Sequence, residues 1–294
     1  MKYTAALLVA GLGLTVLGLV PGTVSADLFQ ELQSGFQYRV ETLAHHTFIE
    51  LEPDGINVGN FLGFARHESA MNVRPDFNLE IRRLGLDFRP RYDLSYRRFE
   101  SGPLANTTDT ADDLYIQEWE ARLSLSDAFL VSTGRVNLQW GPSYILSPSN
   151  PFNRSNGRND PQVEEPGLEV SQLIWFPNYR WTVTLLANTG KGRLASEQPF
   201  SPRYALRTDF IGDGWFAGVV GSITEDEQDP VIGGFAGWTV SEAVLLHTEW
   251  NVDSGPTNGN ALKDGDYLVG GSYTFTSGAF LVAEFFRGGT GCTE

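Results

Sequence analysis

Apolar and polar residues alternate along most of this chain, and the alternation is clearest in its middle. Between Tyr115 and Leu125 most odd-numbered residues are apolar and their neighbours are polar or charged, and the alternation resumes between Arg135 and Trp140, after a turn at Ser126-Asp127. A side-chain period of two predicts β-strands, because successive residues of a strand point to opposite faces of the sheet. This stretch is therefore predicted to be a hairpin with one apolar and one polar face.

The arms of this hairpin are long. A tilted strand of about 9–11 residues crosses a bilayer, whereas strands of soluble proteins average about 5–6. One face carries full charges and must meet water, so the apolar face must be buried elsewhere. A closed barrel in lipid meets both demands, with apolar residues outside and polar residues inside. A soluble β-sandwich is the alternative, although it would show shorter strands and an apolar interior.

Similar runs predict further strands on both sides of the hairpin. They span 35–43, 169–177, 180–188, 203–211, 215–223, 231–240, 243–252, 266–275 and 279–287. Residues 77–88 and 90–99 form either a hairpin with a turn near Arg89-Pro90 or one long strand. Around Val219 and Phe235 both faces are weakly polar, which indicates small residues packed inside the wall.

The predicted fold is all-β: a transmembrane antiparallel up-and-down β-barrel with about thirteen readable strands, in which short turns alternate with long loops. Bacterial barrels of this type have even strand numbers, and an unpaired edge strand in lipid leaves backbone groups unsatisfied. Either one strand is miscounted or the sequence lacks its last strands. The second interpretation is favoured, so the chain is expected to be part of a larger, even-stranded barrel.

Residues 1–26 have the features of a secretory signal peptide. Lys2 precedes an apolar run from Ala5 to Val20, and Val24-Ser25-Ala26 fits a small-x-small cleavage site. This predicts export to the bacterial outer membrane. The predicted barrel domain then spans 27–294, and from the strand count its C-terminal end is expected to be incomplete. The formal net charge of -15, without a basic stripe, argues against a nucleic-acid partner. The expected partners are membrane lipid, a small hydrophilic solute and further copies of the chain in a homo-oligomer.

A set of polar and charged residues falls on the predicted inner face and is expected to line the pore. Its members are Arg39, Glu118, Glu120, Arg122, Arg135, Asn137, Gln139, Arg203, Arg207, Asp209, His247, Glu249 and Glu284. Charges of both signs in a pore filter solutes by charge and size. They can equally pair across the lumen and stiffen the wall, and both roles stay open.

Aromatic residues flank the predicted short turns. They are Trp175, Phe176, Tyr179, Trp181, Phe210, Trp215 and Phe275. Amphipathic rings concentrate at membrane–water interfaces. These residues are therefore predicted to form a lipid-facing girdle on the periplasmic side.

The sequence predicts no catalytic residue, metal site or cofactor. The histidines, His45, His46, His67 and His247, match no recognised ligand spacing. His247, beside Glu249 on a polar face, is expected to be a lumen residue rather than a general base. An enzyme in a barrel wall needs a nucleophile beside a base, and no convincing pair is found, so the protein is expected not to be an enzyme.

The stretch from Gly134 to Phe152, GRVNLQWGPSYILSPSNPF, resembles porin-like outer-membrane proteins of Gram-negative bacteria. In families near the alginate-export proteins, a barrel strand carries Gly-Arg-x-x-x-Gln-Trp-Gly and the next loop ends near Asn-Pro-Phe. The later stretch from Gly270 to Phe286, GGSYTFTSGAFLVAEFF, is similar in style. The resemblance implies an outer-membrane location and solute passage.

The expected function is a porin-like channel for passive or facilitated passage of small hydrophilic or anionic solutes. A non-transport barrel that serves adhesion, envelope assembly or polysaccharide handling is the alternative, and a barrel-embedded hydrolase is a third candidate. Two segments, 45–76 and 141–168, are each either a surface loop or a loop folded into the lumen. For the second, a surface loop is slightly favoured.

Overall fold

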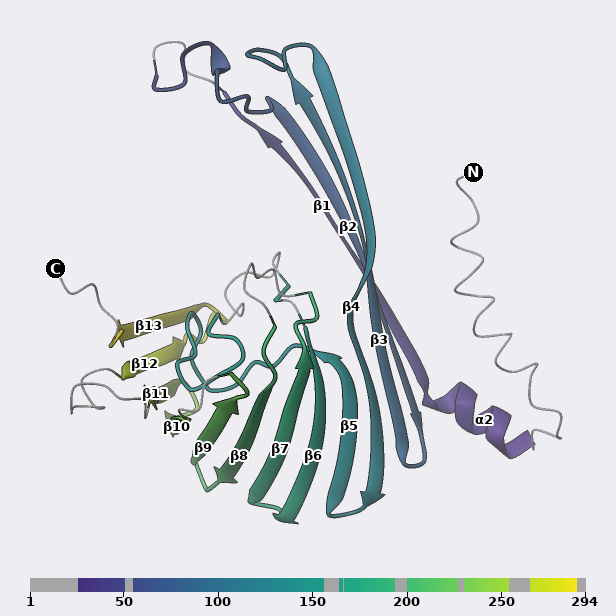
Figure 1. The fold of residues 1–294 in the computed structure, drawn as a ribbon, viewed down its shortest axis with the longest axis vertical. Coiled ribbons are helices and arrows are strands. Elements are labelled where there is room, and N and C mark those ends of the chain that lie inside the picture. The colour runs from purple at the N-terminus through teal and green to yellow at the C-terminus, as the bar shows by residue number, and fades with distance from the viewer. Residues whose placement is uncertain are drawn as a thin grey trace.

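Thirteen antiparallel strands, joined in chain order, make one sheet (Figure 1). The structure is a computed structural model that describes residues 26–50, 55–155, 164–165, 167–193, 200–226, 230–253 and 265–289. Each strand pairs with the next along the chain, so the predicted all-β, up-and-down arrangement and the count of thirteen strands are confirmed. The sheet is not closed, because no pairing joins the first strand to the last among these residues.

The elements follow one another with little other structure between them. They are α2 (Ala26–Gly35), β1 (Phe36–Phe48), the 3-10 turn η1 (Val58–Asn60), β2 (His67–Ile81), β3 (Leu84–Phe99), β4 (Thr107–Ser126), β5 (Phe129–Val136), β6 (Leu168–Asn178), β7 (Trp181–Gly190), β8 (Arg203–Ile211), β9 (Trp215–Thr224), β10 (Val231–Ser241), β11 (Val244–Asp253), β12 (Asp266–Thr274) and β13 (Phe280–Arg287). Within the described ranges, no helix is both long and apolar enough to cross a membrane. The predicted signal peptide lies outside the described residues, apart from its last residue.

Strand length divides the sheet into two regions. Strands β2, β3 and β4 have 15, 16 and 20 residues, whereas β5 to β13 have 8 to 11. Together with β1, the long strands form a twisted ribbon that projects beyond the curved sheet of the shorter ones (Figure 1). The strands are thus longer than the mean for soluble proteins throughout, as the sequence predicts.

Neither prediction for residues 77–99 is correct, because the turn does not lie near Arg89-Pro90 and the segment is not one long strand. Strand β3 runs through both residues, and its hairpin turn with β2 lies instead at Arg82-Arg83. The register between β3 and β4 shifts by one residue at Arg89/Pro90, where Gln117 is the extra residue of a bulge. Proline lacks the N–H that a regular ladder needs, so it is tolerated where a bulge interrupts the ladder.

The segment 45–76 is strand at both of its ends and a connection between them. Strand β1 continues to Phe48 and β2 begins at His67. The described residues between them form a connection at the tip of the projecting ribbon (Figure 1). The next connection is also short, because β3 ends at Phe99 and β4 begins at Thr107. The acidic residues from Asp109 to Asp113 therefore belong to a strand.

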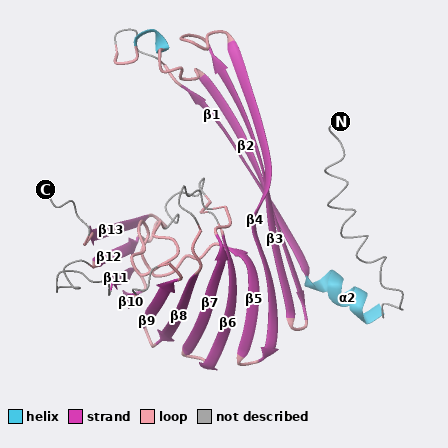
Figure 2. Ribbon diagram, viewed as in Figure 1, coloured by secondary structure: helices cyan, strands magenta, loops and turns pink. Residues whose placement is uncertain are grey.

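The second arm of the central hairpin ends earlier than expected. Strand β5 stops at Val136, and Leu138 and Trp140 leave the sheet instead of continuing its apolar face. They turn onto the concave side of the sheet and join a buried cluster with Leu168, Val170, Leu186, Ala205 and Val220. Figure 2 shows the loop that follows β5 lying over the concave side of the short strands. The segment that begins at 141 therefore folds inward in its described part, against the slight preference for a surface loop.

The two faces of the sheet differ in character. On the outer face of β7 and β8, Leu185 and Leu206 pair with each other and are 56% and 51% exposed. The neighbouring residues Thr184 and Ala205 point to the inner face and are buried. This orientation is the one that the period of two predicts for these strands.

Candidate functional site

A loop that packs against the concave face of the sheet forms the centre of the candidate site. We call residues 137–155 the inner loop; it connects β5 to the segment before β6. In Figure 1 it lies in front of β8 to β12, on the side toward which the sheet curves. Two glutamates of the wall, Glu249 on β11 and Glu284 on β13, accept hydrogen bonds from it.

Glu249 is completely buried and is surrounded by donors from the inner loop. Its Oε1 accepts from the Ser143 N–H at 2.9 Å, and its Oε2 accepts from the Ser147 and Ser149 hydroxyls, each at 2.7 Å. Its exposed fraction is 0%. Burying a carboxylate is costly unless hydrogen bonds replace its water shell. The three serine donors supply those bonds, so Glu249 fixes the loop to the wall.

Glu284 holds the next part of the same loop. It accepts from the Tyr144 N–H at 2.7 Å and the Ile145 N–H at 3.2 Å. It also lies 2.9 Å from Nε2 of His247, a buried residue of β11. The other ring nitrogen of His247, Nδ1, is buried and has no hydrogen-bond partner among the described residues. Two wall carboxylates thus bind one loop over consecutive residues.

Further contacts fix the ends of the inner loop. The Asn251 amide on β11 donates to the Pro148 carbonyl at 3.0 Å, and the Asn150 amide donates to the Leu138 carbonyl at 2.5 Å. Gly141 has a φ of +75°, and a Cβ there would collide with the Glu249 carboxylate. The loop therefore needs glycine at this position for both its backbone angle and its close approach to the wall.

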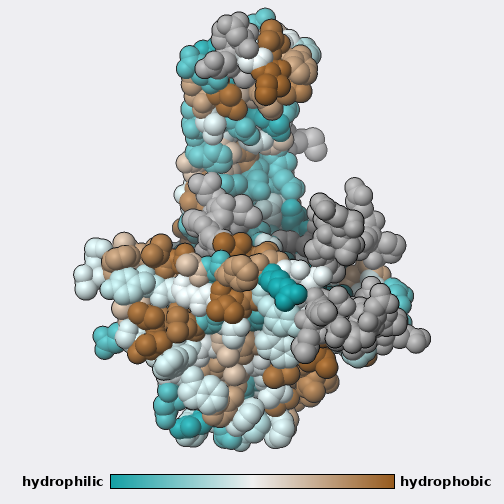
Figure 3. Space-filling view, turned by 90° about the vertical axis from the view of Figure 1, so that its left-hand side faces the viewer, coloured by the Kyte–Doolittle hydropathy of each residue, from teal (hydrophilic) through white to brown (hydrophobic). Residues whose placement is uncertain are grey.

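The inner face of the long strands is lined by ion pairs instead. Arg122 on β4 pairs with Glu80 on β2 at 2.6 Å and with Asp87 on β3 at 2.7 Å. Arg91 on β3 pairs with Asp76 at 3.0 Å. Charges of both signs are thus placed across neighbouring strands, which is the structural role that the sequence left open. In Figure 3 the projecting ribbon is largely hydrophilic below its tip on the side facing the viewer.

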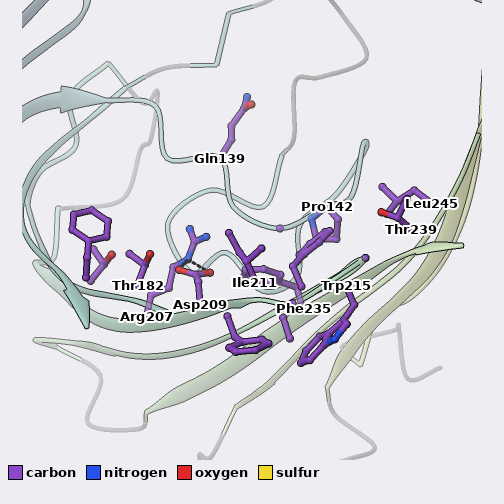
Figure 4. Close-up of a pocket in the computed structure, with 18 of the residues that line it drawn as sticks. Gln139, Pro142, Thr182, Arg207, Asp209, Ile211, Trp215, Phe235, Thr239 and Leu245 are labelled. Atoms are coloured by element: carbon purple, nitrogen blue, oxygen red, sulfur yellow. Dashed lines mark hydrogen bonds and ion pairs between the residues drawn. The ribbon is translucent and has the colours of Figure 1, made fainter. Parts of the chain in front are cut away.

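A cavity of about 810 Å³ lies between the inner loop and the wall (Figure 4). Its lining includes Gln139 from the loop, Thr182 from β7 and the pair Arg207 and Asp209 from β8. Nε of Arg207 donates to Asp209 at 2.9 Å. The Arg207 guanidinium also lies 4.9 Å from the ring of Trp140, a residue of the loop.

Most of the predicted pore-lining residues share the inner face. These are Arg39, Glu118, Glu120, Arg122, Arg203, Arg207, Asp209, His247, Glu249 and Glu284, by strand register, while Asn137 and Gln139 belong to the inner loop. Arg135 does not share it: it lies opposite Glu169 on the other face and pairs with that residue at 2.7 Å. Val136, the next residue of β5, faces inward and packs against the buried cluster. That these residues line a conducting pore stays a prediction.

The predicted aromatic girdle also lies only in part on its predicted face. Four of the rings lie on the outer face at the turn ends of their strands, namely those of Trp175, Trp181, Phe210 and Trp215. Phe275 follows the last residue of β12 with its ring centred 4.7 Å from that of Tyr273, and Tyr179 lies in a turn. Rings touch across strands, with Phe210 centred 4.8 Å from both Trp181 and Trp215. Phe176 differs, because it faces inward and lines the cavity. That the outer rings meet lipid stays a prediction.

Sequence reasoning missed the residues that anchor the loop. Ser143, Ser147 and Ser149 carry the donors to Glu249. Gln117, the bulge residue, donates to the Glu165 carbonyl at 2.7 Å and so ties β4 to the chain after the loop. The one available signal was the concentration of serine and proline between Pro142 and Pro151.

No family model matches this chain, and no curated protein matches it. Solved structures with a similar fold include porins from Rhodopseudomonas blastica. A triple mutant of that porin is 12% identical, with 85% of this chain and 83% of that chain covered and a TM-score of 0.45. A second variant is 12% identical, with coverage of 86% and 94% and a TM-score of 0.39. These neighbours are porins, and the similarity concerns the strand arrangement alone.

Proposed function

We propose that this chain forms an outer-membrane β-barrel channel for the passive or facilitated passage of small hydrophilic or anionic solutes. The observation that supports it most is the inner loop, bound by Glu249 and Glu284 on the concave face. A loop held against the inside of a polar-lined wall narrows the lumen and leaves the strands around it intact. Such a constriction selects solutes by size and by the charges that line it.

The orientation of alternate residues supports the membrane location. Large apolar side chains such as Leu185, Val219 and Leu246 are about half exposed on the outer face, while the inner face carries the charges. In water, an apolar surface of this extent would be unfavourable. In lipid it is the surface that a barrel presents. The partners we propose are therefore membrane lipid, a small solute and, as in many porins, further copies of the chain.

Closure of the sheet is part of the proposal. Unpaired backbone groups in the hydrocarbon region cost several kcal/mol each. We therefore propose that the edges of β1 and β13 are paired in the membrane, within a closed barrel. Export by a cleaved signal peptide over residues 1–26 would bring the chain to that membrane.

Conductance in planar bilayers tests the proposal. Protein refolded in detergent and shown by circular dichroism to be rich in β-structure is added to one side of the membrane. We expect discrete, ohmic current steps. A flat trace from such folded protein would count against a channel and favour a barrel that serves adhesion, envelope assembly or polysaccharide handling.

A further inference from the structure

We propose that the cavity beneath the inner loop binds small organic monocarboxylates with an apolar body. This inference rests on the proposed channel, because the cavity opens on the inner face of the sheet, and it names the solute class of that channel. The geometry around Arg207 carries the argument, together with the chemistry of the other lining residues.

The Arg207 guanidinium is fixed in place by its neighbours, but only its Nε is paired. Its Nε pairs with the Asp209 carboxylate at 2.8 Å. The ring of Trp140 lies 4.9 Å from it and the ring of Phe235 lies 5.3 Å from it. No acceptor for its two terminal nitrogens is found in the described part of the chain. Because Arg207 lines the cavity, those nitrogens are free to serve a ligand there (Figure 4).

Two terminal guanidinium nitrogens match the geometry of a carboxylate. They donate two parallel hydrogen bonds to its two oxygens, and such bidentate pairs are among the strongest polar contacts in proteins. Stacking on aromatic rings holds the guanidinium plane before the ligand arrives, which reduces the entropy lost on binding. The Arg207 guanidinium is therefore preorganised to bind a planar anion.

The neighbouring charge decides what kind of anion fits. Asp209 lies against the same guanidinium, so the net charge of the pair is close to zero. A dianion such as a phosphate ester would be repelled by Asp209 more strongly than a monocarboxylate. This argues for a ligand with a single negative charge.

The rest of the lining is suited to an apolar body. Ile174, Phe176, Ile211, Phe216 and Phe235 contribute hydrophobic surface, and Gln139 and Thr182 add a few polar groups. The volume of about 810 Å³ lies within the range of small-molecule pockets, which are mostly apolar with a few fixed polar groups. A neutral sugar would use the polar groups and rings but would leave the free guanidinium nitrogens without an anion.

Equilibrium dialysis of labelled benzoate against the folded full-length chain in detergent tests the proposal. We expect benzoate to bind at least tenfold more tightly than benzyl alcohol, phenyl phosphate or glucose. Equal binding of benzoate and benzyl alcohol would overturn the role of the charge. Tighter binding of phenyl phosphate, or of glucose, would overturn the monocarboxylate class. These comparisons use the unmodified protein, so they decide the matter without any variant.

Variants then locate the site. Arg207→Gln should weaken benzoate binding at least tenfold. Arg203→Gln, the matched control on the same strand, should change it less than twofold, because Arg203 does not line the cavity. Arg207→Lys, which keeps the charge but not the forked donor, should weaken it at least threefold. Unchanged binding in either Arg207 variant would contradict the proposal.

Failure of this inference can be told apart from failure of the channel. Conductance without benzoate binding would leave the channel standing and remove the monocarboxylate site. Benzoate binding with the expected loss in Arg207→Gln, but a flat bilayer trace, would keep the site and remove the channel.

Discussion

The inner faces of the projecting ribbon and of the curved wall satisfy their polar groups in different ways. In the ribbon, β1 to β4, charged residues pair with each other across strands, as Arg122 does with Glu80 and Asp87. In the wall, β7 to β13, the carboxylates of Glu249 and Glu284 have no arginine or lysine partner among the described residues and instead accept N–H and O–H groups of the inner loop. Most of the inner face of the ribbon is open to water, apart from Arg91 and Gln117, which contact residues 164–165, whereas the inner face of the wall is covered by the inner loop.

The difference follows from the residues that each region places inward. Beneath the loop the wall has small or apolar residues such as Ala205, Val220 and Gly233, and a Cβ added to Gly233 would lie 3.2 Å from the Ser149 Cα. Larger side chains there would keep the loop away. The ribbon carries long charged side chains instead, and solvent reaches those of Arg39 and Arg122 although Arg91 is buried. The composition of the inner face thus determines where a loop can pack.

The largest effect should come from Glu249, because it is the most buried member of the loop contact. Glu249→Gln replaces one acceptor oxygen with a donor, which leaves serine donors of the loop unsatisfied. We expect a loss of about 3–5 kcal/mol in the free energy of unfolding, because hydrogen bonds to a charged acceptor are lost and each buried donor left unsatisfied costs about 1–3 kcal/mol. Denaturant unfolding in detergent measures it, and protease cleavage between 141 and 149 should increase.

Glu68→Gln is the matched control for that change. Glu68 lies on the inner face of the ribbon, in β2, and is partly exposed. The same substitution there should cost less than about 1 kcal/mol. Similar losses in both variants would mean that the two regions do not differ as described.

The next effect compares the outer face of the wall with the inner face of the ribbon. Leu185→Arg should cost about 2–4 kcal/mol if the residue lies near the bilayer midplane, because a charge there meets acyl chains. Ser95→Arg, on the inner face of β3, should cost about 0.5 kcal/mol or less, since it faces water. Unfolding of both variants in lipid vesicles provides the measurement, and equal costs would show that the facing assignment is wrong.

A smaller effect separates backbone strain from contact with the wall. Gly141 and Gly278 have φ values of +75° and +85°, so alanine is strained at both positions. Only at Gly141 would the new Cβ meet another group, the Glu249 carboxylate; at Gly278 nothing lies within 4 Å. Gly141→Ala should therefore cost about 1–3 kcal/mol more than Gly278→Ala, as expected for overpacking. Equal costs by denaturant unfolding would argue against close packing of the loop.

The smallest effect belongs to the ion pairs of the ribbon. Arg122 has a side chain that is 30% exposed, so its pairs are partly screened by solvent. Arg122→Gln should lower the free energy of unfolding by about 1 kcal/mol or less. The loss should shrink further when salt is added. A large, salt-independent loss would place Arg122 in a buried network like that of Glu249.

The alternation of side chains was enough to predict most of the strands. Strand β8 lies at 203–211 as expected, and the other strands after the inner loop differ by at most two residues at either end. The exceptions have local causes. Pro90 was taken as a turn residue, although a bulge lets a strand continue through it. Leu138 and Trp140 continue the period of β5 but follow its end, because burial against Leu168 and Val170 outweighs further pairing.

The candidate site could be predicted only in part. Glu249 was placed in the lumen because of its position in a strand, which is a local property. Its partners could not be identified, because Ser147 and Ser149 are separated from it by 102 and 100 residues. Contacts of this kind depend on the tertiary fold and leave no periodic signal. Arg135 was assigned to the wrong face for another reason, because its stretch was taken to present its apolar residues outward, whereas the register of β5 places Arg135 on the outer face with Val131.

The central claim is that alternate side chains of the sheet face lipid and water, and cysteine labelling in proteoliposomes tests it most directly. In a background with Cys292→Ser, single cysteines replace Phe77, Leu79, Leu86 and Phe88 on the outer face of β2 and β3, and Asn78 and Asp87 on the inner face. A charged maleimide that does not cross membranes should react with the cysteines at Asn78 and Asp87 and leave the other four unmodified. Equal labelling of all six, or the reverse pattern, would contradict the account.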